Sequence, residues 1–543
     1  MNRENEKQSV LIKTFEGTAL DEISAEYNLP DYLPDINRLL KVSAKISESS
    51  HYLSGDAVEY DGKLKCAILY ATGDGSLKSA EFERDFSGTT AVSGTAGDCD
   101  IRFEPQIASV SCRLQNPRKL TAKMKLSLAT SVLCANEVSP IITGKISADD
   151  EKTLEARTHS IASVCSAFTE EKNTPISEDI ELEASLPAIE EIVSVEMDPY
   201  MTDIRVGDGK VIYKGDIFTN ILYLAARDDN TEAGAAPKYV SFCAKIPIAG
   251  EIMVDGISER YIPFASVAVS TPEFRPQTNA FGENRTAEID FDYSVSVELF
   301  CNEESILTTD MYSTEYESTA EADSLRYDSV LAAKTFNFTS EGSVKTDDSD
   351  FDKIVMTSAT ASIDRTEKAG NKLWFTGSAN VSVILTNGEG IYLAKNFEIP
   401  LRAETDGMGL HEFFDIQSRP TVLSASARLD GDSIHVNLET LISYIIFEKH
   451  NEPYVQKLSV YKDKPIIREK DASLLLCYPA PTDSLWDIAK KYSTTTAAIM
   501  EMNGISAEST PTVLVIPRRE SISNKVHNRT ENRFSLRNAQ GNK

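Results

Sequence analysis

Residues 33–70 read LPDINRLLKVSAKISESSHYLSGDAVEYDGKLKCAILY, and the same pattern of apolar, proline and glycine positions occurs three times in the chain. The second copy, residues 186–223, keeps the Leu-Pro opening, the spacing and the closing Ile-Leu-Tyr. The third copy, residues 351–385, keeps the apolar and glycine positions but lacks the Leu-Pro opening and the final Tyr. The copies lie about 150 to 160 residues apart, which is the spacing of domains and far longer than a solenoid repeat.

The end of each copy has the periodicity of a β-strand. In residues 58–70 the apolar side chains and one glycine take every second position, so a strand would place them on one face. The fifth residue of this stretch is glycine in all three copies, at Gly62, Gly215 and Gly377. A glycine inside a strand indicates a bend or a bulge. We therefore expect each stretch to be the central strand of an antiparallel sheet.

The segments that follow each copy also alternate and end in a hairpin, which predicts a mostly-β multidomain protein. We expect three repeated antiparallel domains, each a β-sandwich or barrel-like, and a small α+β (βααβ) domain at the end. The expected β domains are residues 1–147, 178–302 and 338–469. Acidic runs indicate linkers at residues 148–177 and 303–337, the α+β domain takes residues 470–519, and a disordered basic tail takes residues 520–543.

Composition limits the class of protein and its partners. The chain has 543 residues and a formal charge of −29, which repels phosphate backbones and argues against nucleic acid as a partner. The eight cysteines are scattered without a CxxC pair, so we expect reduced thiols and no zinc site. Met1–Ser9 is polar and no apolar run reaches 18 residues, so we expect no secretory signal, no membrane span and a cytoplasmic location.

Signatures of catalysis and cofactor binding are missing from the sequence. There is no Gly-x-Ser-x-Gly, P-loop or His-Glu-x-x-His motif, and the six histidines are far apart. The acidic run that starts at Asp348 resembles the beginning of a calcium loop, but it has Lys353 at the turn glycine and Ala359 at the bidentate glutamate. We therefore expect no catalytic residue, no metal site and no cofactor.

The last folded segment has helical signals. Ser484 and Asp487 have capping-box spacing, and apolar residues then recur at helical intervals up to Tyr492. A second helix is expected from about Thr496 to Asn503, followed by the C-cap Gly504. Apolar strands on either side, at residues 474–478 and 513–517, complete a β-α-α-β order.

These residues resemble a LysM module over about residues 473–518. That family folds as βααβ and commonly binds N-acetylglucosamine-containing glycans in a groove between its two strand–helix loops. The resemblance implies that the residues of the two loops and of the helix start bind a glycan or a protein partner. These residues are Thr482, Asp483, Ser484, Leu485, Trp486, Asn503, Gly504 and Pro511.

Two positions depart from the LysM pattern. The first loop usually has Gly-Asp-Thr, but here Thr482 takes the place of the glycine, and Pro511 lies about where the second loop usually has a glycine. Glycine allows close approach of a ligand, so side chains at these positions would narrow the groove. They favour a protein partner over a sugar. Trp486 could pack against the strands or anchor such a partner.

The repeats are similar to the domain that precedes LysM in the SipL-like family of clostridial spore-coat morphogenesis proteins. The resemblance rests on the Leu33–Ile36 opening and on the strand Gly62–Tyr70. It implies a non-catalytic scaffold in the mother cell, at the forespore surface, that docks through its LysM domain on stage IV sporulation protein A, the ATPase of the coat basement layer. The alternative is a protein that binds peptidoglycan at the cell wall or cortex. An unrecognised hydrolase is a third hypothesis.

Overall fold

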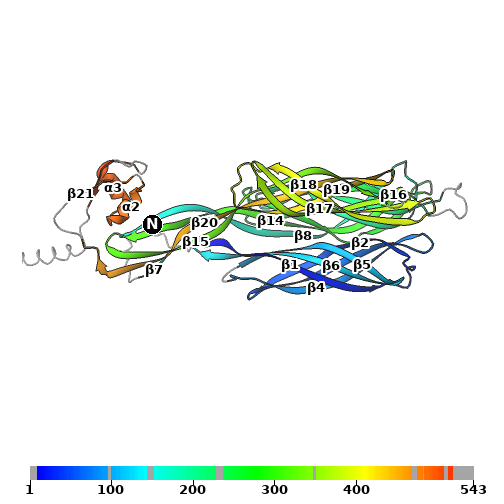
Figure 1. Ribbon diagram of the computed structural model, residues 1–543, viewed down its shortest axis with the longest axis horizontal. Helices are drawn as coiled ribbons and strands as arrows, with labels where there is room; N and C mark the ends of the chain where they lie inside the picture. Colours follow the sequence, from blue (N-terminus) through cyan, green and yellow to red (C-terminus); the bar gives the residue numbers. More distant parts are fainter. Residues whose placement is uncertain are drawn as a thin grey trace, which may run out of the picture.

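The computed structural model describes residues 9–95, 99–143, 152–227, 237–346, 350–467, 474–480, 482–506 and 512–517. Three β-sandwiches lie side by side in an elongated body, and a small helical module sits at one end of it (Figure 1). The prediction of a mostly-β multidomain fold is confirmed. The tail expected at residues 520–543 lies outside the described residues.

Each sandwich follows the same chain order: one long strand, a three-stranded meander, and a returning hairpin whose last strand pairs with the first. In the first sandwich, β6 lies between β1 and β5 in one sheet, and β3 lies between β2 and β4 in the other. Its strands are β1 (Ser9–Asn28), β2 (Arg38–Ser54), β3 (Ala57–Ala71), β4 (Leu77–Ala91), β5 (Cys99–Asn116) and β6 (Lys119–Glu137).

The second and third sandwiches repeat this topology, with β10 and β17 as the centres of their meanders. The second consists of β8 (Leu154–Glu181), β9 (Ile189–Gly207), β10 (Lys210–Ala225), β11 (Tyr239–Met253), β12 (Ile262–Val269), β13 (Glu273–Thr278) and β14 (Asn284–Ser313). The third consists of β15 (Tyr316–Lys345), β16 (Phe351–Ala369), β17 (Lys372–Asn387), β18 (Tyr392–Asp406), β19 (Phe414–Asp430) and β20 (Ser433–Pro465). A short strand, β7 (Ile141–Thr143), runs parallel to β20.

The repeated glycine lies opposite a bulge, as its position in the sequence predicted. The neighbouring strand shifts register beside Gly62, Gly215 and Gly377. At this point its backbone approaches so closely that a Cβ on Gly215 would lie 2.5 Å from the carbonyl oxygen of Tyr200. A Cβ at either of the other two glycines would also collide with a backbone carbonyl oxygen. The glycine is therefore required by the packing of two backbones.

The Leu-Pro opening is a turn that two side chains hold in place. In the first sandwich, Arg118 donates to the carbonyl oxygen of Leu33 at 3.2 Å, and the hydroxyl of Tyr70 donates to that of Pro34 at 3.2 Å. The second sandwich repeats both bonds. There Arg285 donates to Leu186 at 3.1 Å, and Tyr223 donates to Pro187 at 2.9 Å.

The third sandwich lacks this set of residues. In the first two sandwiches, the residue after the long first strand donates its backbone N–H to the carbonyl oxygen of Arg118 or Arg285. In the third sandwich, Thr346 makes the same bond to Asp432, so Asp432 stands where the other two have arginine. Leu385 stands where they have tyrosine. The Leu-Pro opening and the arginine and tyrosine that bond to it are therefore all absent from the third sandwich.

Both segments that were expected to be linkers are largely strand. β8 covers most of residues 148–177 from Leu154 onward, and β14 and β15 cover most of residues 303–337. The linker prediction was wrong because these strands are long and lie at the edge or end of the body, where acidic side chains alternate with partly buried ones. A dense acidic composition is compatible with a strand whose outer face is in water.

The three sandwiches pack in a closed ring. The equivalent residues Leu69, Leu222 and Ile384 of the three central strands meet in one buried cluster. Ser79 donates to the carbonyl oxygen of Val193 at 2.6 Å, which joins sandwich one to sandwich two.

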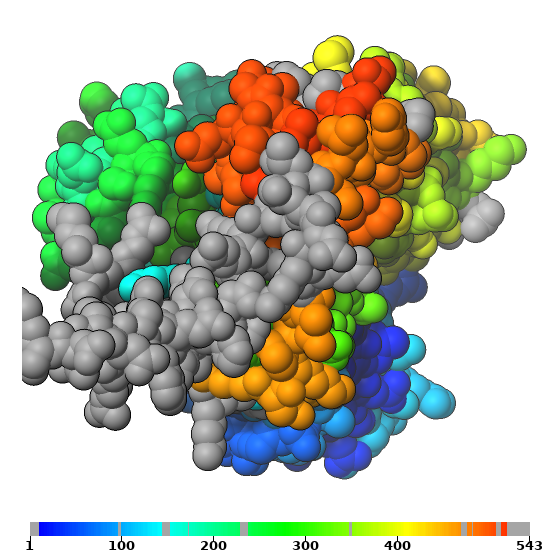
Figure 2. All heavy atoms as spheres, turned by 90° about the vertical axis from the view of Figure 1, so that its left-hand side faces the viewer, coloured from blue at the N-terminus to red at the C-terminus, as the bar shows by residue number. Residues whose placement is uncertain are grey.

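The same bond recurs from sandwich two to sandwich three. There Ser241 donates to the carbonyl oxygen of Val355 at 2.7 Å. Arg38 closes the ring by donating to the carbonyl oxygen of Tyr392 at 3.0 Å. Seen end-on, the first sandwich (blue) lies below the other two (Figure 2). The arrangement has pseudo-three-fold symmetry.

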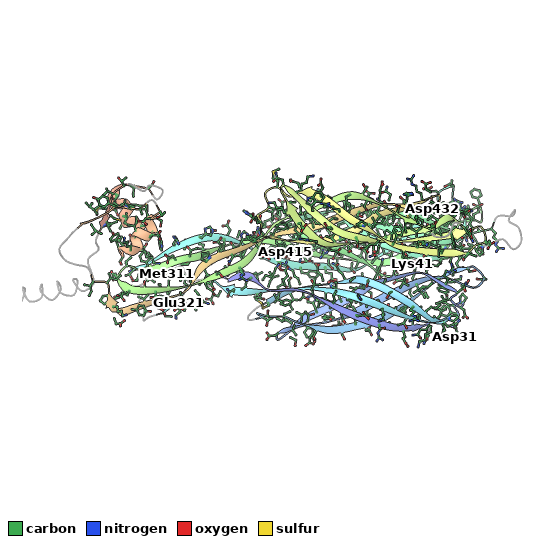
Figure 3. All side chains as sticks on the ribbon, in the orientation of Figure 1. Asp31, Lys41, Met311, Glu321, Asp415 and Asp432 are labelled. Atoms are coloured by element: carbon green, nitrogen blue, oxygen red, sulfur yellow. A yellow bond between two sulfur atoms is a disulfide. The ribbon has the colours of Figure 1, made fainter. Side chains whose placement is uncertain are left out.

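Charged groups also join the sandwiches, and Figure 3 shows Lys41 and Asp415 at these junctions. The ammonium of Lys41, in the first sandwich, lies 2.6 Å from Glu196 of the second and donates to Ser358 of the third at 2.5 Å. Lys13 lies 3.0 Å from Asp415 of the third sandwich. Burial acts to raise the pKa of Asp415, but hydrogen bonding with Glu16 and the charge of Lys13 lower it to about 2. These ion pairs lie between domains, where they are partly shielded from solvent.

Two strand pairs extend beyond the sandwiches and form a stalk (Figure 1). β8 pairs with β14 as far as Leu154 and Ser313, and β15 pairs with β20 from Tyr316 and Pro465 inward. A small core joins the stalk strands to the end of the first sandwich. This core contains Val10, Val138, Ile161, Leu307, Leu325, Tyr327 and Tyr454.

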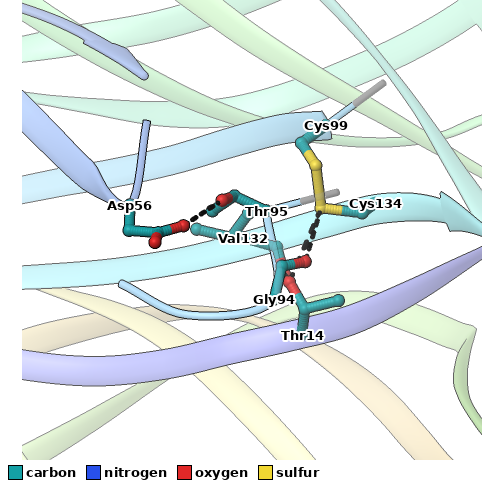
Figure 4. Close-up of a disulfide and its surroundings, with 7 residues drawn as sticks. All are labelled: Thr14, Asp56, Gly94, Thr95, Cys99, Val132 and Cys134. Carbon is teal, nitrogen blue, oxygen red and sulfur yellow. Dashed lines mark hydrogen bonds between the residues drawn. A yellow bond between two sulfur atoms is a disulfide. The ribbon is translucent and has the colours of Figure 1, made fainter. Parts of the chain in front are cut away.

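The prediction that all eight cysteines are reduced was wrong for four of them. Cys99 is bonded to Cys134, and Cys165 is bonded to Cys301 (Figure 4 shows the first pair). Each pair consists of register partners in adjacent strands. Sequence separations of 35 and 136 residues gave no sign of this, because only the strand register brings the thiols together. The remaining thiols, at Cys66, Cys112, Cys243 and Cys477, are free.

Candidate functional site

The C-terminal module (residues 474–517) has the expected βααβ order. β21 (Leu474–Cys477) pairs antiparallel with β22 (Leu514–Pro517), and α2 (Leu485–Lys491) and α3 (Thr496–Asn503) lie between them in the chain. Both helices cover one face of this two-stranded sheet. The shared core contains Cys477, Leu485, Ile488, Ala489, Ile499, Leu514 and Ile516.

The first loop of the module uses its polar groups internally. Ser484 is the N-cap of α2, and its hydroxyl accepts from the backbone N–H of Asp487 at 3.2 Å. The Asp487 carboxylate accepts from the backbone N–H of Ser484 at 3.3 Å, which completes the predicted capping box. The carboxylate of Asp483 accepts from the backbone N–H of Ala480 at 2.9 Å, and Thr482 lies in the same turn. Leu485 is buried in the core.

Asn503 at the second loop is also a structural residue. Its side-chain amide donates to the carbonyl oxygens of Ile499 at 2.8 Å and Val515 at 2.7 Å, and its oxygen accepts from the Val515 N–H at 2.7 Å. Gly504 ends α3 with φ 62°, the left-handed conformation that favours glycine at a C-cap. Pro511 lies outside the described residues.

Trp486 packs against the stalk. It is 9% exposed, and its indole N–H donates to the carboxylate of Asp310 on β14 at 2.7 Å. The ring meets Tyr312 edge-on at a centroid distance of 5.1 Å, and the guanidinium of Arg157 lies 5.8 Å from it. The sequence left open packing against the module's own strands or contact with a partner, and the structure instead places the ring against the stalk.

Two further bonds fix the module to the stalk. Lys490 reaches the same carboxylate, Asp310, at 2.7 and 2.9 Å. The hydroxyl of Tyr312 donates to the carbonyl oxygen of Thr494 at 2.7 Å. Burial acts to raise the pKa of Asp310, but the hydrogen bonds from Lys490 and Trp486 outweigh it and hold the pKa below its ordinary value.

Sequence reasoning missed these stalk residues because it assigned Asp310 and Tyr312 to a linker. A signal was present: residues 305–312 (SILTTDMY) contain one acidic residue among β-branched, apolar and aromatic ones, which is the composition of a strand. The stalk contacts the module through α2 and the turn after it. The opposite side of the module, where its sheet lies, faces away from this contact.

The outer face of the module's sheet is apolar and uncovered. Leu476 is 58% exposed, Tyr478 72% and Val513 38%. Leu476 lies on the opposite side of β21 from Cys477, which faces the helices, because side chains alternate along a strand. Tyr478 directly follows β21, and Val513 directly precedes β22.

Grooves elsewhere lie between the sandwiches. The larger one, of about 740 Å³, separates the first and second sandwiches and is lined by residues of both charge signs, among them Lys45, Lys65, Glu81 and Asp198. Among the described residues, no His, Cys, Asp or Glu cluster is placed to hold a metal ion, and no helix is long and apolar enough to cross a membrane.

Comparison with protein families agrees with this architecture. A model of the SipL SPOCS domain matches residues 35–115 and 188–274, and a LysM domain model matches residues 480–513. Comparisons with curated proteins and with solved structures found no match. The SPOCS matches begin at the Leu-Pro turn of the first and second sandwiches, and the third sandwich, which has no such turn, is not matched. The chain therefore contains two segments that match the SipL SPOCS domain and a C-terminal segment that matches the LysM domain.

Proposed function

We propose that the chain is a non-catalytic scaffold in assembly of the spore coat or envelope, and that its LysM domain docks on a protein partner. The match to the SipL SPOCS domain supports a spore-related role, and the match to the LysM domain supports a binding role. The partner that fits the SipL resemblance is the coat ATPase, stage IV sporulation protein A. The proposed site of action is the mother cell, at the forespore surface.

The single observation that favours a protein partner over a glycan is that three polar side chains described at the two loops bond within the module. A sugar is recognised by polar groups that are free to bond its hydroxyls. Here the side chains of Asp483, Ser484 and Asn503 already bond the module's own backbone. The ring of Trp486, at the start of α2, already contacts Asp310 and Tyr312.

The body of the protein suits a scaffold. Three sandwiches joined in a ring form one thick rod, and the stalk places the LysM domain at its end (Figure 1). Such a rod can hold partners at separated places on its surface, and linked interfaces of modest strength gain avidity through effective concentration.

A peptidoglycan-binding role is the second candidate, and Tyr478 is the observation that favours it. This aromatic ring is largely exposed directly after β21, at the start of the first loop. An exposed aromatic ring can stack on the apolar face of a sugar.

The test compares the full chain with a chain that ends at residue 467, before the LysM domain. We expect the full chain to bind purified stage IV sporulation protein A in biolayer interferometry and the shortened chain to lose this binding. Circular dichroism of the shortened chain, with unchanged β content, serves as its control. Equal binding by both chains would overturn docking through LysM. Pelleting of the full chain with purified peptidoglycan, without binding to the ATPase, would establish the second candidate.

A further inference from the structure

Both disulfides lie beside a contact between the first two sandwiches. The hydroxyl of Ser166 in β8 donates to the carboxylate of Asp100 in β5 at 3.0 Å. Asp100 directly follows Cys99, and Ser166 directly follows Cys165. Each side of this hydrogen bond is therefore one residue from a disulfide.

Arg102 continues the same contact further along β5. Its guanidinium lies 4.5 Å from the ring centroid of Phe300 and 3.9 Å from the carboxylate of Glu298, both in β14. Phe300 directly precedes Cys301 of the second disulfide. Ile161, earlier in β8, belongs to the core that joins the stalk to the first sandwich. We therefore call these interactions the stalk-base contact, which consists of Asp100, Arg102, Ser166, Glu298 and Phe300.

The sandwich fold itself does not require these disulfides. Cys134 and Cys301 occupy equivalent positions, 16 residues after the arginine that bonds to the Leu-Pro turn, where the third sandwich has Glu448. The third sandwich, residues 316–465, has the same topology and contains no cysteine. The partner cysteines come from opposite sides of the equivalent strand, β5 in the first sandwich and β8 in the second. What the two pairs share is their place beside the stalk-base contact.

The surroundings of the cysteines suit both oxidation states. Cys99 and Cys165 are half-buried. Their partners Cys134 and Cys301 are each only 2% exposed. A small thiol or disulfide can therefore react at one sulfur of each pair, since thiol–disulfide exchange requires access to a sulfur atom. In the reduced chain the buried thiol of Cys134 has an acceptor, because the carbonyl oxygen of Gly94 lies 3.5 Å from its sulfur (Figure 4).

We propose that the two cysteine pairs form a thiol–disulfide switch that controls the stalk-base contact. In the oxidised chain the bonds hold the start of β5 on β6 and hold β8 on β14, so both sides of the contact keep their positions. In the reduced chain the start of β5 and the base of the stalk open more readily, because a strand end without a cross-link frays. The switch acts within one chain, so this inference goes beyond the proposed function and does not depend on it.

Oxidation of each pair needs an acceptor for two electrons, and a small disulfide such as oxidised glutathione supplies it. The thiolate of Cys99 attacks one sulfur of oxidised glutathione, which forms a mixed disulfide and releases one glutathione thiolate. The thiolate of Cys134 then attacks the Cys99 sulfur and releases the second glutathione. The two cysteine protons end on the two glutathione thiols. Cys165 and Cys301 react in the same way, and reduced glutathione reverses both steps.

The test equilibrates the full folded chain in buffers of reduced or oxidised glutathione and measures hydrogen exchange by mass spectrometry. Peptides from residues 99–104 and 161–168 should exchange about tenfold faster or more in the reduced chain. Peptides of β17, in the third sandwich, are the internal control and should not change. Alkylation of free thiols in parallel samples should show that both pairs reduce and form again in the folded chain.

Two variants separate the switch from other effects of the buffers. C99S/C165S, which can form neither bond, should exchange like the reduced chain in both buffers. The matched control C243S removes a free thiol outside both pairs and should keep the full difference between the buffers. Three results would overturn the proposal: equal exchange at the stalk base in both buffers, an equal increase in β17 on reduction, or pairs that do not reduce and form again while the chain is folded.

Discussion

In the repeats, a tyrosine packs against a glycine of the neighbouring strand, and mutation can test this contact. In the second sandwich, Tyr213 on β10 is directly opposite Gly250 on β11. Its hydroxyl donates to Glu171 at 2.7 Å and lies 3.1 Å from that of Tyr293, so the ring cannot move aside. A Cβ added to Gly250 would lie 2.6 Å from the Cζ atom of Tyr213 and closer still to its hydroxyl oxygen.

The repeats contain a natural version of the double substitution. Tyr60 is opposite Gly88 in the first sandwich, whereas Phe375 is opposite Ala403 in the third. The methyl group of alanine is tolerated where the hydroxyl is missing. We therefore expect Gly250→Ala to destabilise the second sandwich by about 1–3 kcal/mol through overpacking. Tyr213→Phe should cost about 1–2 kcal/mol through the lost hydrogen bonds.

The double variant Y213F/G250A should cost less than the sum of the two single changes, because the hydroxyl oxygen that the new Cβ would meet most closely is gone and the ring, without its hydrogen bonds, can shift away from the new methyl group. The coupling free energy is then about 1–2 kcal/mol in the stabilising direction. Hydrogen exchange followed by mass spectrometry gives the opening free energy of β10 and β11 peptides, and peptides of β3 in the same molecule serve as the internal control. Additivity of the two changes within about 0.5 kcal/mol would refute the proposed collision.

Three further outcomes follow from other features. Gly215→Ala should destabilise β10 by about 2–4 kcal/mol, since its Cβ meets a backbone oxygen. Gly207→Ala, whose Cβ would meet only the Cγ of Lys210 at 4.0 Å, should be close to neutral in the same exchange assay. Asp310→Asn should shift the emission of Trp486 to longer wavelength in a Trp374→Phe background. Because the folded pKa of Asp310 is lowered, its contact with Trp486 in the wild type should be complete above about pH 4 and lost as the pH falls below it. An emission shift that instead appears between pH 6 and 8 would contradict this assignment. Under denaturing conditions the oxidised chain should expose four reactive thiols, and eight after reduction, by titration with Ellman's reagent; eight before reduction would exclude both disulfides.

The repeated stretch carried enough information to predict the fold class, the central strands and the bulge beside their glycine. Each of these depends on local periodicity or on one backbone position, such as Gly62, and local patterns are visible in a sequence. The capping box of Ser484 and the C-cap Gly504 could be predicted for the same reason.

The remaining features depend on partners that are distant in the chain. The disulfide between Cys165 and Cys301 needs the register of β8 on β14, and the ring of sandwiches needs three outer faces to meet. The position of Trp486 depends on Asp310 in a segment whose acidic composition indicated a linker. Sequence reasoning therefore predicted the fold class and local elements and missed the contacts between segments that are distant in the chain.

One cross-linking measurement tests the central claim, that three repeats form a closed body with the LysM domain fixed to its stalk. A carbodiimide joins a lysine to a carboxylate only where the two are in contact. Lys78 lies 2.6 Å from Glu191, Lys449 lies 3.4 Å from Glu16, and Lys490 lies 2.7 Å from Asp310. Mass spectrometry of the dilute monomer should find all three amide links, which join sandwich one to two, three to one, and the LysM domain to the stalk. Recovery of links within a sandwich, such as Lys123 to Glu22, without any of these three would contradict the closed body.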